Sequence, residues 1–127
     1  MQLNLKNIDA RSKCSIACSL DIVGDKWSLL IIRDAIFLKK KSFNEFRNSA
    51  EKIASNILTN RMEKLVRYGI MNKSQNPDNK LKFDYILTDK GKQLKPIVDA
   101  LGEWGYQHID GTNNVQEQVK KLKRTGE

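Results

Sequence analysis

The first apolar pattern in the chain is helical. Apolar side chains within residues 15–23 lie three and four positions apart, at Ile16, Leu20 and Val23. Positions with this spacing share one face of a helix, so the pattern predicts a short helix that ends at Gly24.

A second helix is predicted over residues 26–37, which are apolar on nearly every side. Asp25 precedes it and has the kind of side chain that commonly caps a helix start. Because such a helix has no polar face to turn towards water, we expect it in the middle of the domain.

Residues 42–68 have the outline of a helix-turn-helix, in which a tight connection joins two helices. Ser42 and Glu45 stand three positions apart, as in a capping box that bonds the free amides at a helix start. The short helix that they begin is predicted to bury Phe43 and Phe46.

The second helix of this motif is predicted from Ser55, as its N-cap, to about Tyr68, and Gly69 ends it. At 100° per residue its apolar side chains gather on one side, made by Leu58, Met62, Leu65 and Val66. The opposite side carries Asn56, Thr59, Asn60, Glu63 and Arg67. Amide and hydroxyl groups bond base edges and phosphates, so this face suits a DNA recognition helix. An ordinary amphipathic helix has the same pattern.

A β-hairpin is predicted over residues 70–87. Pro77-Asp78-Asn79 favours a turn. The half-buried strand after it is predicted from the alternation of Leu81, Phe83, Tyr85 and Leu87 with Lys82, Asp84 and Ile86. A hairpin at this place in the chain would act as a wing that reaches the DNA backbone through Lys73, Lys80 and Lys82.

The C-terminal part predicts one long helix and a shorter one. The long helix covers residues 89–108, with Thr88 as its cap and a kink at Pro96. Its apolar stripe is more than a domain of this size can bury, so we expect it to form a homodimer interface. The stripe consists of Leu94, Ile97, Val98, Leu101 and Trp104. Residues 111–127 predict a further helix, or a tail, that joins the interface or frays.

The charge is concentrated in the middle of the chain. The 23 Lys and Arg against 15 Asp and Glu leave a net charge of +8. Residues 39–95 hold 14 basic and 6 acidic side chains, which accounts for the whole excess, since 14 − 6 = +8. This favours a polyanionic partner such as double-stranded DNA, although a basic surface without a partner is also common.

Other features exclude several classes of protein. A length of 127 residues fits one domain, residues 1–127. Two cysteines and one histidine are too few for a disulfide scaffold or a zinc site, and no apolar run is long enough for a membrane segment. No nucleophile with a base motif and no phosphate-binding glycine loop is present. We therefore expect a cytoplasmic protein that is not an enzyme and that has no metal and no cofactor.

Several spaced motifs carry a resemblance over residues 14–106. They are Cys14, Leu20-Asp21, Gly24-Asp25-Lys26-Trp27, Phe43-Asn44-Glu45-Phe46-Arg47, Ile53-Ala54-Ser55, Leu58-Thr59-Asn60-Arg61-Met62, Leu65, Gly69-Ile70 and Tyr85-Ile86-Leu87-Thr88-Asp89-Lys90-Gly91. The chain resembles the HxlR-type family of bacterial winged-helix transcription regulators, which are relatives of the MarR group. The resemblance implies a mainly α fold with a small β-hairpin wing, and a homodimer built by N-terminal and C-terminal helices that binds operator DNA.

The resemblance also implies site residues. The start of the family's recognition helix is matched by Ser55, Asn56, Thr59, Asn60 and Arg61, and its wing by Lys80 and Lys82. Lys64 and Lys73 are further candidate DNA contacts. The wing differs from the family pattern, because Pro77-Asp78 and lysines stand where Pro-Pro and an Arg are common. Lysine lacks the planar fork of arginine, so this wing is expected to follow phosphates rather than enter the minor groove.

Cys14 aligns with a cysteine that some family members use to sense oxidants, quinones or aldehydes, although Ser15 follows it where the family often has proline. Lys13 beside it and its place near a helix start favour the thiolate form. A free cysteine is also frequently a small buried apolar residue.

Two functions from different classes therefore remain. The first is a dimeric regulator that binds a pseudo-palindromic operator and responds to an oxidant or a small-molecule effector. The second is a winged-helix module that binds RNA or another protein. Few aromatic residues lie among the lysines, which argues against single-strand stacking.

Overall fold

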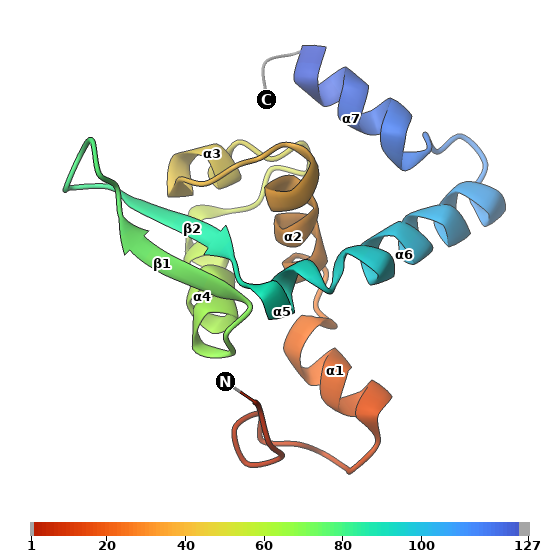
Figure 1. The fold of residues 1–127 in the computed structure, drawn as a ribbon. Helices are drawn as coiled ribbons and strands as arrows, with labels where there is room; N and C mark the ends of the chain where they lie inside the picture. The colour runs from red at the N-terminus through yellow and green to blue at the C-terminus, as the bar shows by residue number, and fades with distance from the viewer. Residues whose placement is uncertain (1, 125–127) are drawn as a thin grey trace.

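The computed structural model describes residues 2–124 and is mainly helical with one antiparallel hairpin, as predicted (Figure 1). Its elements are α1 (Ser15–Val23), α2 (Ser28–Phe37), α3 (Phe43–Arg47), α4 (Ser55–Arg67), β1 (Met71–Gln75), β2 (Phe83–Leu87), α5 (Asp89–Lys92), α6 (Lys95–His108) and α7 (Val115–Arg124). The predicted helix-turn-helix is α3 and α4, and the predicted wing is the β1–β2 hairpin. Residues 125–127 of the predicted C-terminal segment lie outside the described residues.

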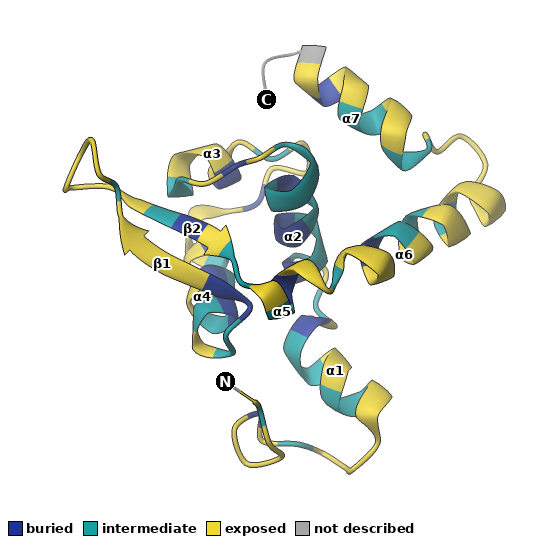
Figure 2. Cartoon of the chain, in the orientation of Figure 1, coloured by how far each residue is buried: buried dark blue, intermediate teal, exposed yellow. Residues whose placement is uncertain are grey.

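The hydrophobic core lies where α2, α3, α4 and the start of the hairpin meet. Its fully buried side chains include Ile32 on α2, Phe46 on α3, Leu58 and Leu65 on α4 and Met71 on β1. Figure 2 shows buried positions gathered in these elements, whereas α1, α6 and α7 are mostly exposed or partly buried. The apolar α2 is therefore the central helix, as predicted.

A buried ion network fastens α2 to the segment around α3. Asp34 is 2% exposed and Lys40 is 5% exposed, and Lys40 Nζ lies 3.2 Å from Asp34 Oδ2. Lys40 also donates to the carbonyl oxygen of Asn48 at 3.1 Å. Arg33 donates to Asp34 and, through both terminal nitrogens, to the carboxylate of Glu51. The hydrogen bond from Arg33 lowers the pKa of Glu51 more than partial burial raises it. Because each charge lies beside a charge of opposite sign, this pairing offsets the cost of removing the charges from water.

The wing packs against the start of α3. In the hairpin Met71 lies opposite Leu87 and Gln75 lies opposite Phe83. The Tyr85 N–H donates to the Lys41 carbonyl oxygen at 2.8 Å, so the segment before α3 lines the outer edge of β2. Tyr85 is buried in the core, and this contact ties the wing to the helix-turn-helix.

The second strand of the wing begins at Phe83, so the prediction that it includes Leu81 is wrong. Leu81 is 91% exposed. The Asn76 side chain accepts hydrogen bonds from the N–H groups of Asp78 and Asn79 at 2.8 and 3.0 Å. These local bonds stabilise a turn, and the alternation of residue types does not reveal where that turn ends.

The predicted single helix over residues 89–108 is two helices. Thr88 caps α5 by accepting from the Gly91 N–H at 3.1 Å, as predicted, but α5 ends at Lys92. Pro96 lies in the first turn of α6 and does not kink a continuous helix. A proline has no N–H to donate, and the first turn of a helix is the place where none is needed. No helix within residues 2–124 is long and apolar enough to cross a membrane.

Candidate nucleic-acid interface

The start of α3 is held by the predicted capping box. The Glu45 N–H donates to Ser42 Oγ at 3.2 Å, and the Ser42 N–H donates to Glu45 Oε1 at 3.0 Å. The hydrogen bonds that the Ser42 and Lys41 N–H groups donate to its carboxylate lower the pKa of Glu45. The box fixes α3 against the wing, because Ser42 also forms a β-bridge with Asp84.

The outer face of α4 is exposed, as its helical phase predicts. Leu58, Met62 and Leu65 are buried against the core. The opposite face, with Asn56, Thr59, Asn60, Glu63 and Arg67, is exposed to solvent. An α-helix with this division can enter the major groove of DNA while its apolar side stays in the core.

The N-cap of α4 is Ala54, so the prediction that Ser55 caps this helix is wrong. Ala54 has an extended backbone (φ −67°, ψ 144°), and its methyl side chain cannot accept a hydrogen bond from the first amides of α4. Ser55 is instead the first helical residue, and it is exposed. Uncapped amides at a helix start attract anions, including phosphate.

Arg61 lies at the edge of the outer face of α4, and its side chain is half-buried. Its Nε lies 2.8 Å from Asp25 Oδ2, and a terminal nitrogen donates to the side-chain oxygen of Asn60. Ile57 lies four residues before Arg61 and Leu65 lies four residues after it. This spacing places Arg61 at the edge of the buried stripe. That helical phase was a signal, visible in the sequence, that Arg61 would turn inward.

The N-cap of α2 is Trp27, so the prediction that Asp25 caps this helix is wrong. Asp25 is the partner of Arg61 and lies just before that cap. Its carboxylate accepts the N–H groups of Trp27 and Ser28, each at 3.0 Å, although α2 begins at Ser28 rather than at residue 26. Burial raises the pKa of Asp25, but the hydrogen bonds from Ser28 and the two amides, with the charge of Arg61, lower it by more. One carboxylate thus ties the recognition helix to the central helix.

The lysines predicted for the wing are exposed. Lys73 on β1 lies over the Phe83 ring, 4.5 Å from its centroid, while Lys80 and Lys82 lie in the turn. A groove of about 420 Å³ runs between α4 and the wing, and its lining includes Thr59 and Lys73. The structure therefore brings Lys73 beside the outer face of α4. Lys64 is half-buried at the edge of that face.

Three further polar residues, which the sequence patterns did not single out, lie beside Ser55. Asn44, Arg47 and Lys52 line a polar hollow at the start of α4. Arg47 ends α3 and Lys52 lies within the connection to α4, in the segment that carries the excess charge. Their place at and within that connection was the available signal.

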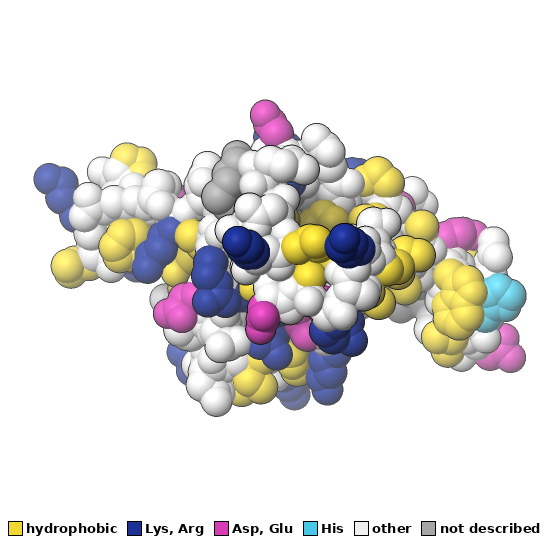
Figure 3. All heavy atoms as spheres, turned by 90° about the horizontal axis from the view of Figure 1, so that it is seen from below, with side chains coloured by type: hydrophobic (Ala, Val, Ile, Leu, Met, Phe, Trp, Pro, Cys, Tyr) yellow, Lys and Arg dark blue, Asp and Glu magenta, His cyan; other side chains and the backbone are white. Residues whose placement is uncertain are grey.

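Charge is distributed unevenly over the surface. Figure 3 shows Lys and Arg side chains on the wing and below the core, whereas the far end of α6, marked by His108, shows hydrophobic and acidic side chains.

Within the described residues, no group of three or more His, Cys, Asp or Glu side chains is placed to hold a metal ion.

A family model described as "HxlR-like helix-turn-helix" matches residues 22–113. The chain belongs to this family. The match includes both helices of the motif, the wing and α6, and it ends before α7.

Curated relatives agree with the membership. The chain is 31% identical over 103 residues to the uncharacterized HTH-type transcriptional regulator YdeP of Bacillus subtilis, covering 81% of this chain and 80% of YdeP. It is 32% identical over 109 residues to an uncharacterized HTH-type transcriptional regulator of Methanothermobacter thermautotrophicus, covering 84% of this chain and 80% of that regulator.

Solved structures share the fold of this HxlR-like chain. PA1607 has a TM-score of 0.74 at 37% identity, covering 81% of this chain and 72% of PA1607. The redox regulator HypR in its reduced form has a TM-score of 0.67 at 31% identity, covering 76% of this chain and 95% of HypR. The chain is therefore a winged helix-turn-helix protein of a transcriptional regulator family.

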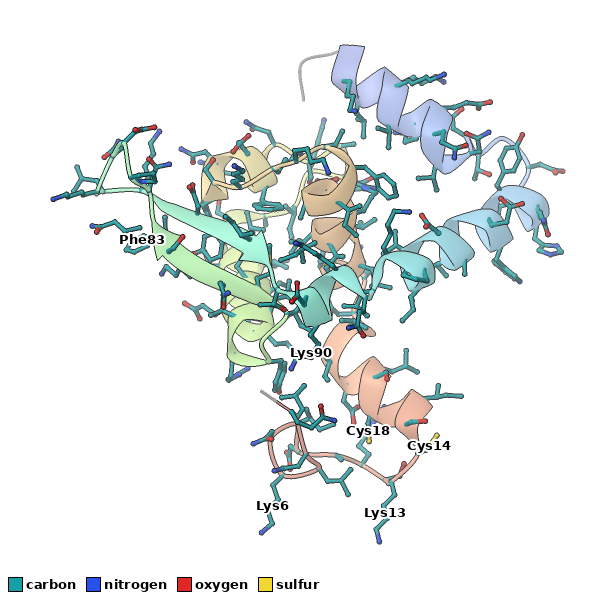
Figure 4. All side chains as sticks on the ribbon, viewed as in Figure 1. Lys6, Lys13, Cys14, Cys18, Phe83 and Lys90 are labelled. Carbon is teal, nitrogen blue, oxygen red and sulfur yellow. The ribbon has the colours of Figure 1, made fainter. Side chains whose placement is uncertain are left out.

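The two cysteines of this HxlR-like chain lie in and beside α1. Cys14 is the N-cap of α1, and its side chain is exposed. Cys18 is half-buried, and its Sγ donates to the Ser12 carbonyl oxygen at 3.2 Å. Both thiols are free. In Figure 4 the Lys13 side chain extends away from the Cys14 sulfur, so the sequence neighbour is not a direct partner of the thiol.

Two helices of the HxlR-like fold expose apolar side chains. On α1 the exposed residues are Ile16 and Leu20, and on α6 they include Leu101 and Trp104, which are 57% and 59% exposed. Both helices project away from the core (Figure 1). An exposed stripe of this kind marks an interaction surface.

Proposed function

We propose that this HxlR-like chain is a homodimeric, sequence-specific DNA-binding transcriptional regulator that acts on a pseudo-palindromic operator. The observation that carries the proposal is the exposed polar face of α4 with the lysine-bearing wing beside it. No catalytic step, metal or cofactor enters the proposal. Because a regulator of this kind acts on DNA, the proposal also implies a cytoplasmic protein.

Each predicted site residue has a role in the proposed complex. Asn56, Thr59 and Asn60 lie at the exposed N-terminal half of α4 and contact base edges in the major groove. Phosphates are bound by Ser55 at the start of α4, by Lys64 further along the same helix, and by the wing lysines Lys73, Lys80 and Lys82. Arg61 positions α4 through Asp25. The polar hollow formed by Asn44, Arg47 and Lys52 adds phosphate contacts.

The homodimer is formed by α1 and α6, whose exposed apolar stripes are buried between two copies. A dimer with twofold symmetry presents two recognition helices to successive major grooves, about 34 Å apart. The symmetry of the protein is then matched by the pseudo-palindrome of the operator.

A pair of variants tests base reading against phosphate binding. Asn60→Ala is expected to weaken binding to the operator about 5- to 150-fold while leaving random duplex unchanged, because an amide bonded to a base edge contributes only at the right base. Lys82→Ala is expected to weaken binding to both duplexes and to reduce the salt dependence by about one phosphate per protomer. Fluorescence anisotropy on DNA from upstream of the gene, at several salt concentrations, measures both.

Equal losses on operator and random duplex for Asn60→Ala would remove Asn60 as a base reader. Failure of the unmodified chain to prefer upstream DNA over random duplex would instead favour the alternative of a protein- or RNA-binding winged helix.

We place the control of DNA binding by oxidants or electrophiles at Cys14, because its thiol is exposed at the start of α1, next to the apolar stripe of that helix. The thiolate attacks a peroxide, the O–O bond breaks, hydroxide leaves, and the cysteine becomes a sulfenic acid. A polar sulfenic acid at this place disturbs the packing of α1 in the dimer.

Cys14→Ser is expected to abolish the release of operator DNA by hydrogen peroxide, which electrophoretic mobility shift measures. Cys18→Ser is the control, since the half-buried Cys18 is expected to leave the response intact. Peroxide-dependent release that is the same in Cys14→Ser and in the unmodified chain would contradict the assignment.

A further inference from the structure

An apolar cavity of about 220 Å³ lies between α2, α6 and α7. The apolar walls contributed by α2 include Leu29, Leu30 and Phe37, and those contributed by α7 include Val115, Val119 and Leu122. The α6 side is completed by Val98, Leu101 and Gly102. The lining is almost wholly apolar, which is typical of small-molecule sites.

One wall of this cavity is formed by α7, in the C-terminal part of the chain. α7 turns back from the end of α6 (Figure 1). It lies close against α6, since a Cβ on Gly102 would come within 2.5 Å of a Val115 methyl carbon. Leu122 is only 7% exposed. The family match ends at residue 113, so α7 adds this wall outside the residues that define the family.

The charge of the lining indicates an uncharged ligand. The charged side chain that reaches the cavity is Arg33, and its guanidinium already bonds the carboxylates of Asp34 and Glu51. Asn113 and Gln118 also reach it, and their side-chain amides bond each other at 2.8 Å. No unpaired charge among the described lining residues is therefore available to hold an anion or a cation.

The size of the cavity limits the ligand. An apolar cavity of about 150 Å³ is known to bind benzene. A cavity of 220 Å³ is about half as large again and therefore has room for a molecule of about ten heavy atoms, such as a fused two-ring aromatic.

We propose that the cavity between α2, α6 and α7 binds a small, uncharged, mainly aromatic molecule, with α7 as its cover. The ligand contacts α2, which is central to the helix-turn-helix core, and α6, which carries the exposed stripe. A ligand between α2 and α6 therefore affects the angle between the helix-turn-helix core and the helix that carries the proposed dimer interface. This regulatory consequence, unlike the binding itself, rests on the proposed function.

Binding is tested with indole as the probe, by calorimetric titration of the full chain without DNA. The unmodified chain is expected to bind indole with a dissociation constant below about 1 mM, because the apolar ring leaves water for an apolar lining. Benzoate, which is similar in size but charged, is expected to bind at least about tenfold more weakly, because desolvating its carboxylate has no compensating partner.

Val119→Phe is expected to weaken indole binding at least about tenfold, because the added ring fills the cavity. Gln116→Phe, which places the same ring on the exposed side of α7, is expected to leave binding unchanged. Nuclear Overhauser contacts between indole and the methyl groups of Val115 and Val119 in the unmodified chain give a second reading that does not depend on how the variants fold.

Absence of indole binding, equal binding by Val119→Phe, or contacts only to Trp104, which lies on the exposed stripe of α6 and not in the cavity lining, would each overturn the cavity proposal. DNA binding is measured separately on the same variants, so its loss or retention reports on the proposed function and not on the cavity. Operator affinity that changes with saturating indole supports the regulatory consequence. Affinity that does not change, while indole stays bound, removes that consequence.

Discussion

Replacing Asp34 with alanine is expected to lower the free energy of unfolding by about 3–5 kcal/mol. The substitution removes the carboxylate that pairs with the Lys40 ammonium, which is 5% exposed, and a buried charge without its partner is costly. It also removes one of the two carboxylates that bond Arg33. Denaturation in urea, followed by circular dichroism, measures the change.

Asp99→Ala is the matched control. Asp99 pairs with Lys95 at 2.8 Å, but both side chains are about half exposed, so the expected loss is below about 1 kcal/mol. The double replacement Asp34→Leu with Lys40→Met is expected to recover most of the stability, because no buried charge is then unpaired. Similar losses for Asp34→Ala and Asp99→Ala would contradict the importance of burial in this network.

Replacing Trp104 with glutamate is expected to convert the proposed dimer into monomers and to weaken operator binding by about 10²- to 10⁴-fold. Trp104 is 59% exposed on α6, and large aromatic residues carry much of the energy of interfaces. A charge buried there would face apolar side chains of the second copy. In a dimer, once one copy is bound, the second copy binds its half-site as an effectively intramolecular step. A monomer loses this gain, which accounts for the expected loss of affinity of about 10²- to 10⁴-fold. Analytical ultracentrifugation gives the mass, and anisotropy gives the affinity.

Leu5→Glu makes a comparable change on an exposed apolar residue that lies outside α1 and α6, so it is expected to leave both the mass and the affinity unchanged. If Trp104→Glu remained a dimer with full operator affinity, the interface would have to lie elsewhere than on α6.

Features that depend on neighbouring residues were predictable from the sequence. The capping box of Ser42 and Glu45, the end of α1 at Gly24 and the cap at Thr88 each involve groups within a few residues of one another. The division of α4 into a buried and an exposed face follows from the period of the helix. The order of residues along α4 is therefore enough to locate the proposed base-reading side chains.

Features that depend on distant residues were not predictable in the same way. Lys40 contributes to the basic excess of the middle segment, yet it is buried against Asp34. Arg61 matches the start of a recognition helix, yet it bonds Asp25, which lies 36 positions away in the sequence. A side chain with a charge has the same appearance in a sequence whether it faces DNA or a carboxylate inside the protein.

The order of residues alone specifies a winged helix-turn-helix protein with a polar face on one helix, because helix caps and helical phase involve residues that are close along the chain. Which cations face solvent, and how α7 closes a cavity over α2 and α6, is decided by packing in three dimensions. Those outcomes depend on which distant groups meet when the core forms, and the burial of each charge is settled by the partner it meets there.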